Sequence, residues 1–330
     1  MTAIDNEALV ERKVEPKEKH SLWARVLSEF AGSFLICFCI YLMCTFGSTL
    51  YSVNLAFIAL GTGVVYAAMT MIFGKISGGQ FNPAITLAAM LTSKTRVADG
   101  VLYIVAQIIG AICAGGLVKA ILPTSQSISA SQWFAMSVNG FDKGSSLYAS
   151  LNQLGLTFNV TIAIVVELIA SIIVVAAAMV TLKNNGKPTH THALSMGLAY
   201  AAAVAMAYPV TGASVNPIRA TGIAIFAQGE GLAQEPLAQL WVFWVCAILG
   251  AAIVALVIIV AQLIAGRNTE DMMAQEVAED AQEEALEEKA SEVLAEHDDD
   301  ESSVTTDEDV ALTGAQANAL EAQQADTEIK

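Results

Sequence analysis

The sequence predicts an all-α membrane protein, with six transmembrane helices and two re-entrant half-helices in two inverted repeats. Three observations support this fold class. The 330 residues are 55% hydrophobic and only 15% charged, whereas roughly a quarter of the residues in a soluble domain carry charge. Six apolar stretches are long enough to cross a bilayer, and one short motif follows both the second and the fifth of them.

Charge is distributed unevenly along the chain. Residues 267–330 carry 21 acidic and 3 basic side chains, whereas residues 1–266 carry 11 acidic and 13 basic ones. This pattern excludes a basic nucleic-acid-binding protein and an evenly acidic soluble enzyme. We expect an N-terminal segment at 1–21, a membrane domain at 22–265 and an acidic tail at 266–330. The tail is predicted to be disordered, with a helix that binds a regulatory partner as the alternative.

The membrane domain is predicted from the length of its apolar stretches, since a spanning helix needs about 20 such residues. The stretches are residues 22–46, 53–74, 97–121, 158–182, 192–211 and 238–265. Cytoplasmic flanks are rich in Lys and Arg. Basic residues gather on one predicted side, at Arg12, Lys13, Lys17, Lys19, Arg25, Lys75, Lys94, Arg96, Lys183, Lys187 and Arg267. We therefore expect a multi-pass protein of the cell membrane with both termini in the cytoplasm.

An internal repeat divides the membrane domain into residues of about 22–121 and 158–265. Residues 77–84 read SGGQFNPA and residues 211–218 read TGASVNPI, and each motif precedes an apolar run too short to span a bilayer. Glycines at 63 and 197 each lie 19 residues before the Asn of their motif. Because three spans and a short element are repeated, the second copy starts on the opposite side of the membrane.

Each Asn-Pro pair predicts the start of a half-helix, because Asn caps a helix N-terminus and Pro is tolerated at the first helical position. The motif residues concerned are Asn82, Pro83, Ala84, Asn216, Pro217 and Ile218. The two half-helices should meet N-terminus to N-terminus near the midplane. Each Asn uses its side-chain oxygen for the cap, so its amide hydrogens are expected to donate into a lumen.

On these residues the chain resembles the aquaporin, or major intrinsic protein, family, whose signature is two Asn-Pro-Ala half-helices in inverted repeats. The resemblance covers about residues 22–265. It implies a passive channel, not an enzyme, that passes water and small uncharged solutes such as glycerol and excludes protons and ions. It implies no cofactor, no metal and no nucleic-acid partner, and a homotetramer in the lipid bilayer. Small residues such as Gly110, Gly115 and Gly250 suit close helix approach, between subunits or within one.

Arg219 lies three residues after Asn216, and an arginine in apolar surroundings is functional by default. By resemblance it is the arginine of a selectivity constriction. Counting from the two motifs places the other three positions of this constriction on Thr62, Val204 and Ala213. Water-only channels of the family carry an aromatic residue and a histidine at the first two positions. We therefore expect a wider opening that admits small neutral solutes.

The chain departs from the family pattern at several positions. Ala220 stands where glycerol facilitators carry Asp, Ile218 replaces the Ala of the second motif, and Lys75 and Gln80 stand where histidines are common. Ile218 is expected to change how the two half-helices pack. The relative permeability to water, glycerol, urea and gases therefore stays open, as does gating.

Glu29 and Glu167 are the acids deep in the spans. By resemblance they hydrogen-bond the loop backbone and hold its shape, and a proton relay is the alternative. Tyr66 and Gln107 either line the lumen or belong to the core. An ion-coupled secondary transporter also uses inverted repeats and is the alternative function, but the spans contain no ion-binding carboxylate cluster. A membrane enzyme is a third class, for which the spans offer no nucleophile–base pair.

Overall fold

The computed structural model describes residues 20–266. The acidic tail from residue 267 onward and residues 1–19 lie outside the described residues. Residues 20–261 belong to one compact unit, and residues 262–266, the last of the sixth long helix, belong to a second. Every regular element in the described part is helical, apart from an isolated bridge between Leu182 and Pro188.

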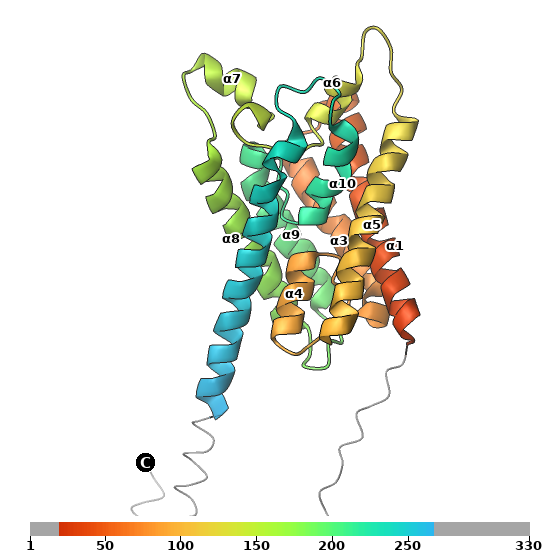
Figure 1. The fold of residues 1–330 in the computed structure, drawn as a ribbon, viewed down its shortest axis with the longest axis vertical. Coiled ribbons are helices and arrows are strands. Elements are labelled where there is room, and N and C mark those ends of the chain that lie inside the picture. Colours follow the sequence, from red (N-terminus) through yellow and green to blue (C-terminus); the bar gives the residue numbers. More distant parts are fainter. Residues whose placement is uncertain (1–19, 267–330) are drawn as a thin grey trace, which may run out of the picture. The chain divides into compact units, whose positions relative to one another are not determined.

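Six helices in residues 20–266 are long and apolar enough to cross a membrane (Figure 1). They are Leu22–Tyr51, α3 (Leu55–Ser77), α5 (Val97–Ile121), α8 (Val160–Thr181), α9 (His192–Thr211) and Pro236–Gly266. The first of these consists of α1 (Leu22–Leu42), a π-helical turn η1 (Met43–Gly47) and α2 (Ser48–Tyr51). The helices coincide with the six stretches expected from the sequence, and the expected all-helical fold is confirmed.

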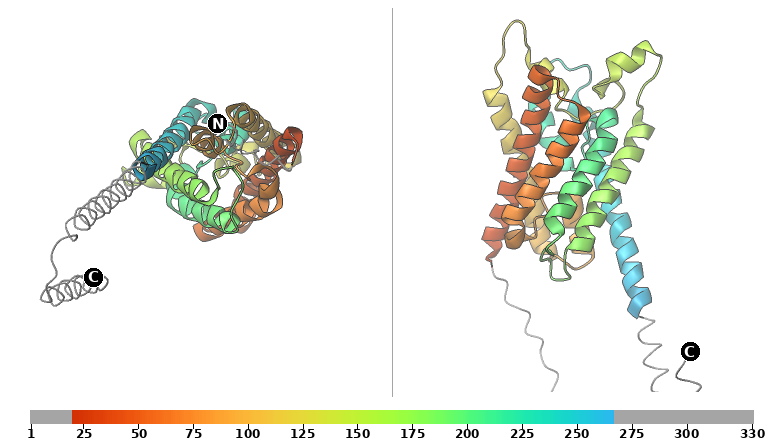
Figure 2. Two further views of the ribbon diagram at one scale, coloured as in Figure 1. Left: turned by 90° about the horizontal axis from the view of Figure 1, so that it is seen from below. Right: turned by 180° about the vertical axis from the view of Figure 1, so that it is seen from behind.

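Two short helices follow the repeated motifs. These are α4 (Pro83–Leu91) and α10 (Pro217–Ala227), which enter from opposite ends of the helical bundle (Figure 1). The view from behind in Figure 2 shows α1, α3, α9 and α8 side by side in front of the half-helices. Proline occupies the first turn of each helix, at Pro83 and Pro217, where its missing N–H removes no helical hydrogen bond. The N-termini of the two half-helices therefore face each other, as the inverted repeat predicts.

Local sequence signals define the ends of the long helices. Ser21, Asn54 and Asn159 each cap an N-terminus by accepting a hydrogen bond from a backbone N–H of the first turn. Gly78 and Gly212 end α3 and α9 in the left-handed region, with φ of 102° and 71°, which glycine adopts without steric cost. Each of these glycines leads the chain directly into one of the repeated motifs.

The long connection between α5 and α8 contains short helices that the sequence analysis does not predict. They are α6 (Ala130–Ala135), η2 (Asp142–Gly144) and α7 (Tyr148–Gln153). Trp133 is buried here, donates to the carbonyl of Pro123 and packs edge-on against Phe46. This anchoring keeps part of the connection packed against the end of the first helix.

Close backbone approaches hold the helices together. Gly63 on α3 faces Gly197 on α9, and a Cβ at Gly63 would lie 2.5 Å from the carbonyl oxygen of Gly197. Gly110 on α5 likewise lies against the backbone of Phe30 on α1. The bundle presents large apolar side chains outward, such as Val180, which is 80% exposed. Such an apolar surface suits hydrocarbon surroundings. The helical backbone suits them as well, because a helix satisfies its own backbone hydrogen bonds.

Candidate functional site

The loops before α4 and α10 share an unusual backbone. Phe81 and Val215, each one residue before the capping Asn, have φ values of 48° and 53°, in a region that bulky and β-branched residues rarely adopt. Strained conformations of this kind persist only where the surrounding structure holds them. Both residues are buried, so the restraint must come from neighbouring protein groups.

Glu29 on α1 supplies that restraint in the first loop. Its carboxylate accepts from the Ser77 hydroxyl (2.6 Å) and from the backbone N–H groups of Gln80 (3.0 Å) and Phe81 (2.7 Å). It also accepts from the side-chain amide of Gln107 (2.8 Å). Gln107 thus contacts the glutamate that binds the loop.

Glu167 on α8 makes the matching contacts in the second loop. Its carboxylate accepts from the Thr211 hydroxyl and from the backbone N–H groups of Ser214 and Val215, both at 2.8 Å. Both glutamates are fully or almost fully buried. In each repeat one carboxylate therefore accepts hydrogen bonds from N–H groups of the loop. These bonds hold the strained residue, Phe81 or Val215, in place.

The two motifs are joined by reciprocal hydrogen bonds. The side-chain oxygens of Asn82 and Asn216 cap their own helices, accepting from the N–H groups two residues later. The side-chain amide of Asn82 donates to the carbonyl of Val215 (3.2 Å), and that of Asn216 donates to the carbonyl of Phe81 (2.8 Å). The left-handed residues thus direct their carbonyls at the Asn of the opposite repeat.

Two tyrosines accept the remaining amide hydrogens. Asn82 donates to the hydroxyl of Tyr200 at 2.8 Å, and Asn216 donates to the hydroxyl of Tyr66 at 2.9 Å. An amide NH₂ group has two hydrogens, so both asparagines are satisfied within the protein. This differs from the expectation that these donors point into an open lumen, because the tyrosyl oxygens take the place expected for a passing solute.

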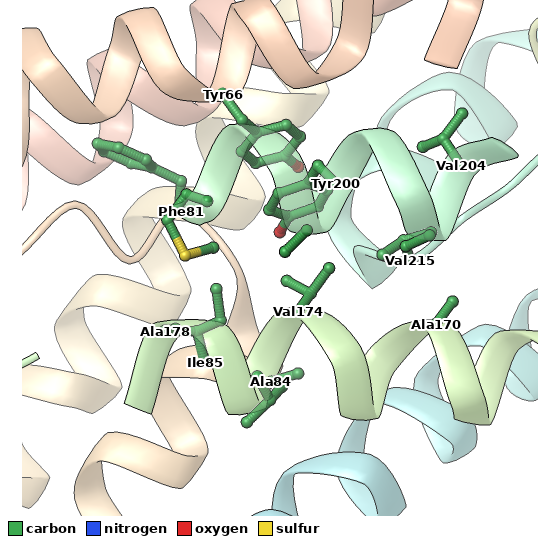
Figure 3. Packing of buried hydrophobic residues seen from close by; sticks show 14 of the residues in the cluster. Tyr66, Phe81, Ala84, Ile85, Ala170, Val174, Ala178, Tyr200, Val204 and Val215 are labelled. Atoms are coloured by element: carbon green, nitrogen blue, oxygen red, sulfur yellow. The ribbon is translucent and has the colours of Figure 1, made fainter. Parts of the chain in front are cut away.

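The two tyrosyl rings stack on each other. Tyr66 on α3 and Tyr200 on α9 have ring centroids 3.3 Å apart and planes 6° from parallel, and Figure 3 shows them face to face. Tyr66 is expected from the sequence either to line the lumen or to belong to the core, and Tyr200 is not among the predicted site residues. The signal was present, since each tyrosine lies 16 residues before the Asn of its own repeat.

Arg219 is buried near the start of α10, with 3% of its surface exposed. Its guanidinium donates to the side-chain oxygen of Asn139 and lies 3.9 Å from the sulfur of Cys44. Its carbonyl accepts from the hydroxyl of Tyr41 at 2.6 Å, and Asn139 itself donates to the carbonyl of Thr211. The connection between α5 and α8 therefore orients the arginine, a contact that the sequence analysis does not anticipate.

The four residues expected to form a constriction line one pocket. Thr62, Val204, Ala213 and Arg219 are joined in its wall by Ile40, Ile58, Tyr66, Tyr200, Tyr208, Gly212, Ser214 and Val215. The pocket holds about 10 Å³, about the space of one water. Three tyrosines, Tyr66, Tyr200 and Tyr208, stand in its wall beside the small residues at 62 and 204, and the expected wider opening stays a prediction.

A second cavity, of about 660 Å³, lies at the other end of α3 and shares no lining residue with the first pocket. The charged residues of its lining are mainly basic and are Arg25, Lys75, Lys94, Arg96 and Lys187. The acid in this lining, Asp99, pairs with Arg25 at 3.0 Å. Partial burial lowers the pKa of Lys94 below its usual range.

The family of the chain follows from comparison with known proteins. Residues 17–258 match the family model described as Major intrinsic protein. The chain belongs to the major intrinsic protein family.

Similar proteins match this chain over about 70% of its length. Glycerol uptake facilitator protein-like 6 of Lactiplantibacillus plantarum is 31% identical and is matched over 94% of its length and 70% of this chain. Aquaporin Z of Photorhabdus laumondii is 29% identical, over 93% of its length and 69% of this chain. The X-ray structure of the aquaglyceroporin from Plasmodium falciparum shares the fold, with a TM-score of 0.56, 20% identity and coverage of 94% of that chain and 71% of this one.

Ile218 departs from the Asn-Pro-Ala signature of the major intrinsic protein family, and its side chain is completely buried. It packs in a cluster with Cys37, Tyr41 and Ala114, whereas Ala84 of the first motif belongs to a different cluster. The expected effect of Ile218 on the packing of the two half-helices stays a prediction. The larger side chain is accommodated between α10 and the neighbouring helices α1 and α5.

Proposed function

We propose that this chain is a passive channel for water and small uncharged solutes such as glycerol, and that it excludes ions and protons. The observation that carries the proposal is the meeting of the α4 and α10 N-termini, joined through Asn82 and Asn216. Each helix N-terminus bears about half a positive elementary charge. Cations therefore meet an electrostatic barrier at this point, whereas neutral molecules do not. The names of the two bacterial relatives support the substrate class.

Within this channel, Thr62, Val204, Ala213 and Arg219 form the selectivity site on the α10 side. Arg219 adds a fixed positive charge and directs hydrogen-bond donors at a hydroxyl group. Their common pocket and the burial of the arginine support these roles.

The cavity on the α4 side opens to the cytoplasm in this proposal, and both termini lie on the same side. Its basic lining supports that orientation, because Lys and Arg are retained on the cytoplasmic face of membrane proteins. Residues 22–265 act as the channel domain, and residues 266–330 form an acidic cytoplasmic extension. The channel needs no cofactor, since permeation breaks and forms no covalent bond.

The experiment that tests the function is osmotic light scattering with the purified protein in proteoliposomes. Vesicles should shrink faster than protein-free vesicles under a sucrose gradient and re-swell faster under a glycerol gradient. Flux should be equal in both directions, electrically silent and insensitive to a protonophore. Uphill accumulation of a solute that collapses when protonophore is added would instead identify an ion-coupled transporter.

A further inference from the structure

The stacked tyrosines bind the residues that define the site. A buried tyrosyl hydroxyl needs a hydrogen-bond partner, and an ordinary core offers many backbone carbonyls for that purpose. Tyr66 and Tyr200 instead accept from the capping residues Asn216 and Asn82. Each tyrosine binds the Asn of the opposite repeat, so the arrangement has the same twofold relation as the half-helices themselves.

The pair forms part of the wall of the small pocket, and along α3 Tyr66 lies on the side of Thr62 that leads toward the large cavity. Residues four apart share one face of a helix, so Thr62 and Tyr66 lie on a single buried stripe that continues to Gly74. Thr62 lines the small pocket on the α10 side and Gly74 lines the large cavity on the α4 side. Tyr66 lies between Thr62 and Gly74 in this stripe, so a molecule that moved along α3 from one cavity to the other would pass the tyrosine.

The stacked rings leave no passage between their faces. Non-bonded carbon atoms in contact are about 3.5–4.0 Å apart, and the ring centroids are 3.3 Å apart. The helices that carry the rings are held close one turn away, at Gly63 and Gly197. A passage between the rings therefore requires the tyrosyl side chains to move, because the helices are held together at these glycines.

We propose that Tyr66 and Tyr200 form a second specificity-determining constriction of this channel, at its centre, in addition to the selectivity site on the α10 side. A solute passes when the rings part and its own oxygen replaces a tyrosyl hydroxyl as the acceptor of an Asn82 or Asn216 amide hydrogen. The solutes selected are small uncharged molecules with a hydroxyl or water oxygen and a carbon body thin enough to slide along the ring faces. This inference rests on the proposed function, and it adds a constriction at the centre to the selectivity site on the α10 side.

Variants at positions 66 and 200 distinguish the effect of the tyrosyl ring from that of its hydroxyl group. The double variant Tyr66→Val with Tyr200→Val removes both the rings and the hydroxyls. We expect its glycerol flux to rise about tenfold, because the loss of one stacking interaction lowers the barrier to passage by about that factor in rate. It should also admit xylitol, a longer polyol. The double variant Tyr66→Phe with Tyr200→Phe keeps the rings and should still exclude xylitol. Tyr148→Val makes the same chemical change in α7, away from both pocket linings, and should leave every flux at the wild-type value.

Light scattering of proteoliposomes with equal protein content measures the fluxes of water, glycerol and xylitol. An unchanged ratio of glycerol to water flux in the Val double variant, with xylitol still excluded, would overturn the inference while leaving the proposed function standing. Absence of flux in the wild type and in every folded variant would overturn both. If the Val variant does not fold, the single variants Tyr66→Leu and Tyr200→Leu, which keep more of the buried volume, carry the same expectation of a raised glycerol-to-water ratio.

Discussion

At the scale of single residues, the site is built from buried polar groups whose partners lie in another part of the chain. Glu29 on α1 binds the loop before α4, and Glu167 on α8 binds the loop before α10. Asn139, in the connection between α5 and α8, orients Arg219. Because an unpaired buried polar group is costly, each such contact makes the position of one side chain depend on a distant segment.

The carboxylate of Glu167 offers a first test at this scale. In Glu167→Gln one acceptor oxygen becomes an NH₂ group facing hydrogen-bond donors, so at least one buried N–H or hydroxyl loses its partner at a cost of about 1–3 kcal/mol. We expect a lower thermal unfolding midpoint in detergent and reduced water flux. The control is Glu230→Gln, which breaks a partly exposed ion pair with Lys119, a pair worth about 0–1 kcal/mol. Equal shifts of the unfolding midpoint in the two variants would contradict the loop-holding role.

The α10-side pocket offers a second test. The double variant Thr62→Phe with Val204→His adds a ring and an imidazole to a pocket of about 10 Å³. Glycerol flux should fall more than water flux, because water needs only a single-file opening. Light scattering under sucrose and glycerol gradients gives the two rates. Equal proportional loss of both fluxes would show that solutes are not sorted at these positions.

At the scale of elements, α3 and α9 approach each other closely beside the stacked tyrosines. Gly63 and Gly197 allow the two backbones to touch, and Tyr66 and Tyr200 follow each glycine by three residues. The same close approach would be impossible with a larger side chain at either glycine. The central stack therefore depends on small residues on both helices.

Adding a methyl group at this crossing tests that dependence. A Cβ at Gly63 would meet backbone, the carbonyl of Gly197, whereas a Cβ at Gly61 on the same helix would meet the flexible end of Met43. We expect Gly63→Ala to cost about 1–3 kcal/mol of stability through overpacking and to change solute flux, with Gly61→Ala close to wild type in both. Thermal unfolding in detergent and glycerol flux are the measurements. Matching behaviour of the two variants would show that the crossing does not control the centre.

At the scale of the whole molecule, the small residues of α5 serve packing inside one subunit. Gly110 lies against the backbone of Phe30, and Gly115 lies against that of Gly222. Gly250 of the sixth helix faces Ser171. Because these contacts lie within one subunit, they do not support the other role expected for the small residues, which is association between subunits. The support for an oligomer is therefore the broad apolar outer surface and the family resemblance.

We nevertheless expect a homotetramer with one pore in each subunit. Apolar side chains such as Leu102 and Leu198 lie exposed on the outer face of the bundle and are available to lipid or to a neighbouring subunit. Native mass spectrometry in mild detergent should give four times the mass of the 34.7 kDa chain. A stable monomer with full water permeability after reconstitution would contradict this assembly.

The sequence by itself determines the spans, the half-helices and the inverted repeat, because each depends on residues that are neighbours along the chain. Apolar length defines a spanning helix, and Asn followed by Pro defines a helix start. Only the tertiary structure decides the centre of the site. The stacking of Tyr66 on Tyr200, the pairing of Arg219 with Asn139 and the small volume beside Thr62 join residues far apart in sequence. Their physical origin is the close packing of helices around a shared interior, which leaves the space at one residue to be filled by side chains from another helix.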